Sequence, residues 1–249
     1  MAALDAATLA AIGSAPIAVL AWCAGDGTPR SCAVTPYVDA GDLVVTSTLA
    51  FPAKGSALRR DPRVSVLVGG RHITGTAEVG VADIEWFDAH LRAQESDKFP
   101  PSRTLFAVPG HRCLVPWYVQ RIVIRVTAPT VADVAGDDAV TATSLGTTGP
   151  MIVPTARPTD LDTDTISVPG VPDGPADLLV HEEHADYADL RQANRRGVVA
   201  GEVLTVATRS GSLAPGTTGT VAQLRELRAL ARRARAERAR IASWPRLAG

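Results

Sequence analysis

The residues best suited to chemistry in this sequence are three consecutive hydroxyls, Thr46, Ser47 and Thr48, and a lysine that follows them, Lys54. The hydroxyls end an apolar run rich in β-branched residues, and Lys54 follows Pro52, a residue that suits the first turn of a helix. A helix N-terminus has unpaired N–H groups and a partial positive charge, so it favours an anion such as a phosphate. The segment therefore predicts a phosphate site. The alternative is a surface lysine on a surface helix.

Two strands and a short helix would position these side chains. The apolar run predicts a strand over residues 43–48, and the next segment predicts a helix over 53–60 that Pro62 ends. A second apolar run predicts a strand over residues 64–68. The hydroxyls and Lys54 would then meet at the point where the first strand leads into the helix.

This order of elements, with the motif K-x-x-x-L-R-R-D-P-R-V that begins at Lys54, resembles the pyridoxamine 5′-phosphate oxidase-like split β-barrel family. The family includes FMN enzymes, deazaflavin (F420)-dependent reductases and some haem binders. The resemblance extends from Pro16 to about Val126, and it departs from the family at Pro52 and Ala53, where many members carry arginine. It implies a mainly β (α+β) fold, an antiparallel split β-barrel, with cofactor sites at a homodimer interface.

The resemblance also implies a cofactor, a type of reaction and the residues that would bind the cofactor. The cofactor would be FMN or F420, and haem is the less favoured choice. The protein would be an oxidoreductase that transfers hydride to or from a small-molecule substrate, with no catalytic side chain assigned. A haem- or ligand-binding module, or a non-catalytic regulatory protein on the same fold, is the alternative; a haem ligand would come from His72, His111 or a cysteine. The residues implied to hold the cofactor are Lys54 with Thr46, Ser47 and Thr48 at the phosphate, and Arg30, Ala33, Val34 and Thr35 along the ring, where backbone N–H groups would bond its edge.

The rest of the first half of the sequence predicts an antiparallel meander with helices between some of its strands. We expect Trp117 and Tyr118 either to line the pocket or to pack in the barrel. Strands are predicted over residues 17–24, 30–37, 72–79 and 113–126, a helix over 82–93, and a loop with a short helix over 94–111.

Beyond a polar boundary at residues 129–141, the pattern partly repeats. Residues 146–156 resemble 25–36, residues 164–168 resemble 42–46, residues 176–182 resemble 63–68, and residues 196–206 resemble 72–81. We therefore expect a cofactor-binding domain over 1–128, and over 142–249 a second, degenerate half-barrel plus a basic C-terminal helix at 220–244. Such a chain would be an intrachain pseudo-dimer with one cofactor site, and an unrelated C-terminal extension is the alternative.

Composition limits the remaining possibilities. A net charge of −1 gives no reason to expect nucleic-acid or membrane binding. Three cysteines are too few for a disulfide framework, and with the lack of a basic N-terminal signal they favour a cytoplasmic protein. The histidines His181 and His184 are three residues apart, which is not the zinc-protease spacing, so we expect a surface turn and no metal site there.

Overall fold

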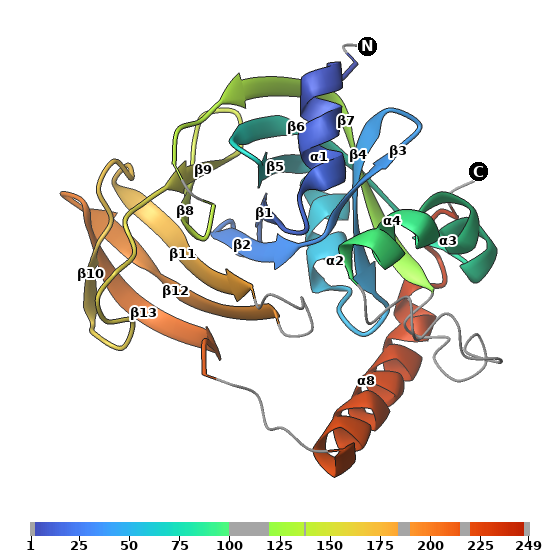
Figure 1. Ribbon diagram of the computed structural model, residues 1–249. Helices are drawn as coiled ribbons and strands as arrows, with labels where there is room; N and C mark the ends of the chain where they lie inside the picture. Colours follow the sequence, from blue (N-terminus) through green and yellow to red (C-terminus); the bar gives the residue numbers. More distant parts are fainter. Residues whose placement is uncertain (1–2, 100–119, 137, 184–189, 215–219, 247–249) are drawn as a thin grey trace.

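The computed structural model describes residues 3–99, 120–136, 138–183, 190–214 and 220–246. The strands form two antiparallel sheets, and a long C-terminal helix, α8 (Thr220–Ile241), packs against the first of them (Figure 1). The prediction of a mainly β, α+β fold is confirmed.

The first sheet is a split barrel. Its strand order is β2-β1-β5-β6-β7-β4-β3, so β2 and β3 are its two edges although only Thr35 separates them in sequence. The sheet must therefore curl until its edges approach one another, and the curled sheet encloses an apolar core. The strands are β1 (Ala18–Cys23), β2 (Pro29–Val34), β3 (Pro36–Asp39), β4 (Asp42–Thr48), β5 (Arg63–Val68), β6 (Arg71–Ala82) and β7 (Arg121–Asp133).

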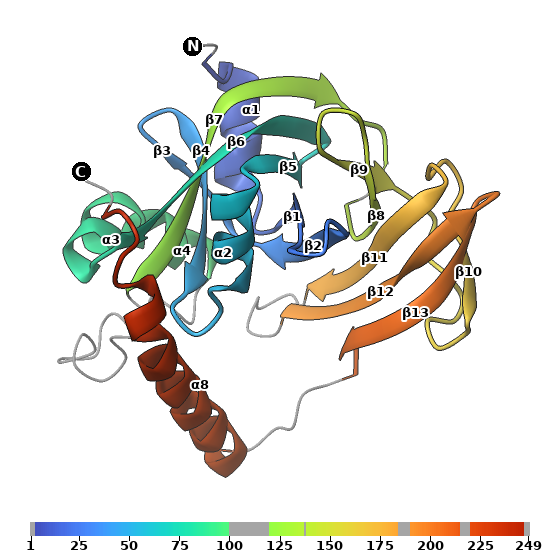
Figure 2. The same cartoon turned by 180° about the vertical axis from the view of Figure 1, so that it is seen from behind.

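Besides α8, the described residues form four helices that accompany this barrel. Asp5 caps α1, because its Oδ1 accepts the N–H of Thr8 at 2.6 Å. Helix α2 joins β4 to β5, with the bounds predicted from the sequence, and α3 and α4 lie beside β3 and β4 (Figure 2). The helices are α1 (Ala6–Ser14), α2 (Ala53–Arg60), α3 (Ile84–His90) and α4 (Arg92–Lys98).

Several predicted elements of this half were wrong in their bounds. The single strand expected over 30–37 is two strands, because Pro36 has no N–H for the β1 ladder and the chain crosses there to the opposite edge. The helix expected over 82–93 is α3, which begins at Ile84 and ends at His90. The short helix expected within residues 94–111 is α4, which begins earlier, at Arg92. Strand β7 runs to Asp133, past the expected domain end at residue 128, because Thr127 to Asp133 still pair with β6. The part of the expected strand before residue 120 lies outside the described residues.

The second sheet has the order β10-β13-β12-β11-β8-β9. It encloses its own smaller core of aliphatic side chains. The repeat expected over residues 196–206 is not one strand, because a turn at Gly201 and Glu202 divides it. The strands are β8 (Val140–Leu145), β9 (Pro150–Pro154), β10 (Thr165–Ser167), β11 (Gly174–Glu183), β12 (Leu190–Ala200) and β13 (Val203–Ser212).

The two sheets share one topology. Read from its β9 edge, the second sheet runs β9-β8-β11-β12-β13-β10, which matches β2-β1-β5-β6-β7-β4 of the first. The registers match as well: Ser65 pairs with Ala21 and Thr74, and Asp177 pairs with Thr143 and Arg196. A bulge follows Thr74 in one sheet and Arg196 in the other. The expected second half-barrel is therefore present, and the strand equivalences read from the sequence hold for β9, β10 and β11.

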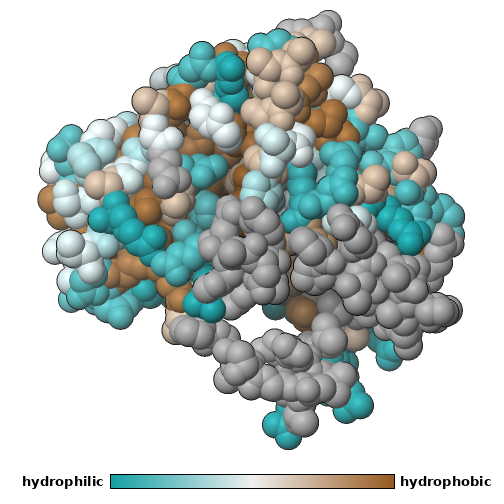
Figure 3. Space-filling view, viewed as in Figure 1, coloured by the Kyte–Doolittle hydropathy of each residue, from teal (hydrophilic) through white to brown (hydrophobic). Residues whose placement is uncertain are grey.

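The two half-barrels pack face to face along a seam, the interface between β1, β2 and β5 on one side and β8, β9, β11 and β12 on the other. Its apolar part joins Val19, Ala21 and Leu67 to Ile152 and Leu179. Figure 3 shows that the outer strands of the second sheet carry mainly hydrophilic side chains on the visible face. Most apolar residues of both halves lie in the cores or the seam, whereas Leu145, Val198 and Val203 of the second sheet are exposed.

Lys98 is a buried lysine that should make stability depend on pH. Its Nζ donates to the carbonyl oxygens of Ile12, at 2.8 Å, and Pro36, and burial lowers its pKa to about 8 although Glu95 opposes the shift. An unfolded lysine keeps its proton up to about pH 10.4. Between pH 8 and 10 the unfolded state therefore binds more protons, and the free energy of unfolding should rise with pH by an amount on the order of 2 kcal/mol.

Urea denaturation at pH 7.5 and pH 10 measures this rise. In Lys98→Met the difference between the two pH values should shrink, since the titrating group is absent. An equal pH dependence in the wild type and the variant would contradict the assignment.

Candidate functional site

The predicted phosphate-binding segment folds as expected at the end of β4. Ser47 Oγ donates to the carbonyl oxygen of Phe51 at 3.1 Å, and the Phe51 N–H donates to Thr48 O at 3.0 Å, so the loop into α2 is tightly turned. Thr48 Oγ1 has no hydrogen-bond partner among the described residues. Thr46 is half-buried on the same strand. The three hydroxyls therefore lie at the end of β4, ahead of α2.

The side chain of Lys54 extends from α2 to the edge strand β2. Pro52 precedes α2 and gives it no side-chain cap, which leaves the first N–H groups of the helix without a side-chain acceptor. The Lys54 ammonium lies 3.6 Å from the Cys32 sulfur in the middle of β2. The structure thus places the Lys54 ammonium beside the predicted ring-side strand.

Two backbone N–H groups of β2, the strand expected to bond the edge of a cofactor ring, already have hydrogen-bond partners. Strand residues direct their N–H groups alternately to opposite edges, so Ser31 and Ala33 face away from β1. Both of these groups are bonded: Ser31 N–H donates to Asp177 Oδ2 at 2.7 Å, and Ala33 N–H donates to Gln192 Oε1 at 3.0 Å. In this structure Ala33 therefore offers its N–H to the second half-barrel.

The other residues of that strand differ in exposure. The side chains of Ala33 and Val34 are buried, and Thr35 is half-buried between β2 and β3. The Arg30 guanidinium pairs with Asp26 at 3.4 Å. Arg30 also lines a cavity of about 270 Å³ together with Arg196 and the backbone around Gly197.

A buried polar cluster lies at the seam, and the sequence did not predict it. Asp177 is fully buried, and Asn194 Nδ2 donates to both Asp177 Oδ1 and the Ser31 carbonyl at 3.1 Å. The Arg196 Nε lies 3.3 Å from Asp177 Oδ1. Burial raises the pKa of the Asp177 carboxyl, and the Arg196 charge and the Ser31 N–H oppose that rise. The one sequence signal is an acidic residue at the head of the apolar run Leu178–Val180.

The C-terminal segment covers one side of α2. Trp244, just past α8, is buried against Gly55, and the Arg59 guanidinium carbon lies 5.1 Å from the Trp244 ring centroid. A second cavity, of about 430 Å³, lies between this segment and the β6–α3 junction, with Arg238, Arg246 and Asp83 in its lining.

The remaining candidates are four residues of the segment 100–119 and two histidines. His111, Cys113, Trp117 and Tyr118 lie outside the described residues. His72 is half-buried in β6, and its partial burial lowers its pKa. The expected surface turn at 181–184 is wrong for its first three residues, which belong to β11, where His181 is buried and contacts the Asp138 carbonyl.

Within the described residues, no three His, Cys, Asp or Glu side chains lie close enough to hold a metal ion. In the same part of the chain, no helix is long and apolar enough to cross a membrane.

Comparison with known proteins gives matches among solved structures. No protein-family model and no curated protein matches the sequence. A conserved hypothetical protein of Mycobacterium tuberculosis is 22% identical over 53% of this chain and 86% of its own, with a TM-score of 0.41. A putative pyridoxamine 5′-phosphate oxidase of Listeria innocua is 23% identical over 51% and 94%, with a TM-score of 0.35. An F420 reductase is 19% identical over 49% and 94%, with a TM-score of 0.34.

These values are too low to assign a function to the chain. Over about half of its length, this chain is similar to structures described as a pyridoxamine 5′-phosphate oxidase and an F420 reductase.

Proposed function

We propose that the chain binds a phosphorylated flavin-type cofactor, FMN or F420, and serves as an oxidoreductase for a small molecule. The observation that carries the proposal is the position of Lys54, which stands in the first turn of the uncapped helix α2 and reaches the edge strand β2. A cation, free helix N–H groups and the hydroxyls at residues 46–48 suit a phosphate, whichever of the two cofactors carries it.

The residues of the chain divide into two groups for this role. Lys54, with Thr46, Ser47 and Thr48, would hold the phosphate. Arg30, Ala33, Val34 and Thr35 would lie along the ring. The Ser31 and Ala33 N–H groups would stay bonded to Asp177 and Gln192 of the second half-barrel. When bound, such a cofactor supplies the hydride chemistry, and the protein supplies binding, orientation and exclusion of water.

One chain should hold one cofactor. The second half-barrel has no helix between β10 and β11, where the first has α2, and Gly170 and Pro172 lie in the short connection instead. The second half would then replace a partner subunit, so we propose an intrachain pseudo-dimer. A titration that shows two equivalent sites per chain would refute this.

An absorption spectrum of the purified protein, with mass spectrometry of the molecule that heat releases, tests the proposal first. A flavin or deazaflavin band supports it and distinguishes FMN from F420. A Soret band would replace it with haem chemistry. A colourless protein that also fails to bind added FMN and F420 would contradict it.

Replacing Lys54 with alanine should weaken binding of the phosphorylated cofactor by about ten-fold or more, because a charge-assisted hydrogen bond is lost. The measurement is a fluorescence titration with FMN or F420. Arg71→Ala is the control, since Arg71 is a cation at the β5–β6 turn that pairs with Asp133, and it should leave the affinity unchanged. Equal affinities of the wild type and Lys54→Ala would refute the site assignment.

A further inference from the structure

The C-terminal helix α8 has a fixed position on the first half-barrel. Ala234 and Ile241 of α8, and Trp244 just after it, belong to the apolar core of that half. A Cβ on Gly55 would lie 2.9 Å from Cζ3 of Trp244, so the indole packs directly on the backbone of α2. The Val81 N–H also donates to the Pro245 carbonyl at 2.9 Å, which secures the end of the segment. The position of α8 relative to α2 is therefore set by packing at several points.

This position brings one arginine of α8 to the start of α2. The guanidinium carbon of Arg233 lies 4.8 Å from the ring centroid of Phe51. Phe51 immediately precedes Pro52, the residue before α2, and its side chain is 41% exposed. Arg233 thus stands at the same end of α2 as Lys54.

The Arg233 side chain is available for a further partner. It is exposed, and no carboxylate of the described residues pairs with it. A guanidinium held over an aromatic face keeps its N–H groups directed outward in its own plane, which suits a phosphate that accepts two hydrogen bonds. The ring of Phe51 therefore orients the cation without neutralising it.

We propose that Arg233 is a second cation for the phosphate of the bound cofactor, acting together with Lys54 at the start of α2. The inference rests on the proposed function, since it concerns the same site. The C-terminal helix then has a binding role besides its packing role: it brings to the phosphate a charge that the segment from Thr46 to Lys54 supplies only once.

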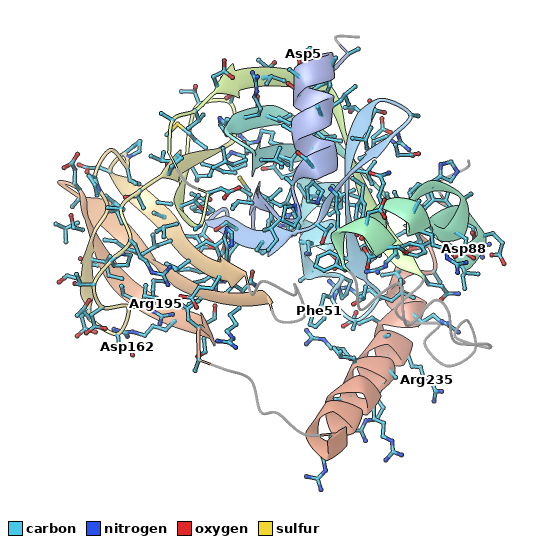
Figure 4. All side chains as sticks on the ribbon, in the orientation of Figure 1. Asp5, Phe51, Asp88, Asp162, Arg195 and Arg235 are labelled. Atoms are coloured by element: carbon cyan, nitrogen blue, oxygen red, sulfur yellow. The ribbon has the colours of Figure 1, made fainter. Side chains whose placement is uncertain are left out.

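A neighbouring arginine of the same helix gives a matched control. Arg235 is two residues further on, which rotates it by about 200° around the helix. It projects from the side of α8 that faces away from Phe51 (Figure 4). Arg233→Gln and Arg235→Gln change the net charge equally and both alter exposed residues, so they differ only in the direction of the lost guanidinium.

The test is a fluorescence titration of the full chain with FMN and with riboflavin, which lacks the phosphate. The same comparison is made with F420 and its phosphate-free deazaflavin core. Arg233→Gln should raise the Kd for the phosphorylated ligand about ten-fold and leave the Kd for the phosphate-free ligand unchanged. Arg235→Gln should change neither value. Thermal unfolding curves that superimpose on that of the wild type would confirm that both variants fold.

Three results would overturn the inference, and they can be told apart. If Lys54→Ala weakens binding of the phosphorylated ligand and Arg233→Gln does not, the phosphate site stands and the role of Arg233 fails. If Arg233→Gln and Arg235→Gln weaken binding equally, the effect is one of net charge and the inference also fails. If the wild type binds none of the four ligands, the proposed function fails and the inference with it.

Discussion

Asp177→Ala should lower the free energy of unfolding by about 3 kcal/mol. Removing one partner of a buried ion pair leaves the other charge and its hydrogen-bond donors without compensation. The groups that would lose their partner are all at the seam: the Ser31 N–H, the Asn194 amide and the Arg196 guanidinium. Because these groups belong to both half-barrels, the loss should weaken the contact between them as well as the fold of the second.

Urea denaturation measures the change as a shift in midpoint. Asp164→Ala is the control: Asp164 also pairs with an arginine, Arg209, but its side chain is 90% exposed. An exposed pair contributes about 0–1 kcal/mol, so this variant should remain close to the wild type. Equal midpoints for the two variants would show that the seam cluster does not stabilise the protein.

Gly197→Ala should cost about 3 kcal/mol, because the bulge of β12 leaves no room for a side chain. A Cβ at this position would lie 1.7 Å from the carbonyl oxygen of Thr205, which is a backbone atom that cannot move without distorting β13. Forcing a methyl group into such a contact costs about 1–3 kcal/mol, and more when backbone must shift. Gly75, at the equivalent bulge of β6, is less crowded, with 2.7 Å to Thr127 O, so Gly75→Ala should cost about 2 kcal/mol.

Gly13→Ala is the matched control for both variants. No atom lies within 4 Å of a Cβ at Gly13, and the residue lies in α1, where alanine is preferred to glycine. The variant should therefore be as stable as the wild type or slightly more stable. Thermal or urea unfolding of the three variants checks the order, and a Gly197→Ala protein as stable as Gly13→Ala would contradict the crowding argument.

The sequence predicted the elements whose signals are local. Helix α2 begins after Pro52 and ends before Pro62 as expected, because proline acts on the residues next to it. The hydroxyl run at the end of β4 was visible because it, too, is a local pattern. Local patterns could not show that the strand expected over 30–37 changes edges at Pro36, because that change depends on the closure of the whole barrel.

The seam was beyond the reach of local patterns altogether. Asp177 meets Ser31 across 146 residues of sequence, and nothing near either residue indicates the other. Likewise Arg233 meets Phe51 only because Trp244 and Ile241 dock α8 on the barrel. The charges of α8 were visible in the sequence, but their directions were not.

The equivalent registers of the two sheets have a consequence for how such a chain can change. In a symmetric dimer of identical subunits, every substitution is made twice and must be tolerated at both copies of its position. Here the equivalent positions Ser65 and Asp177 are separate codons, and they differ: Ser65 Oγ donates to the Pro150 carbonyl, while Asp177 accepts the Ser31 N–H. One half therefore has α2 while the other has no helix at the equivalent place. A substitution in either half alters one position and not two.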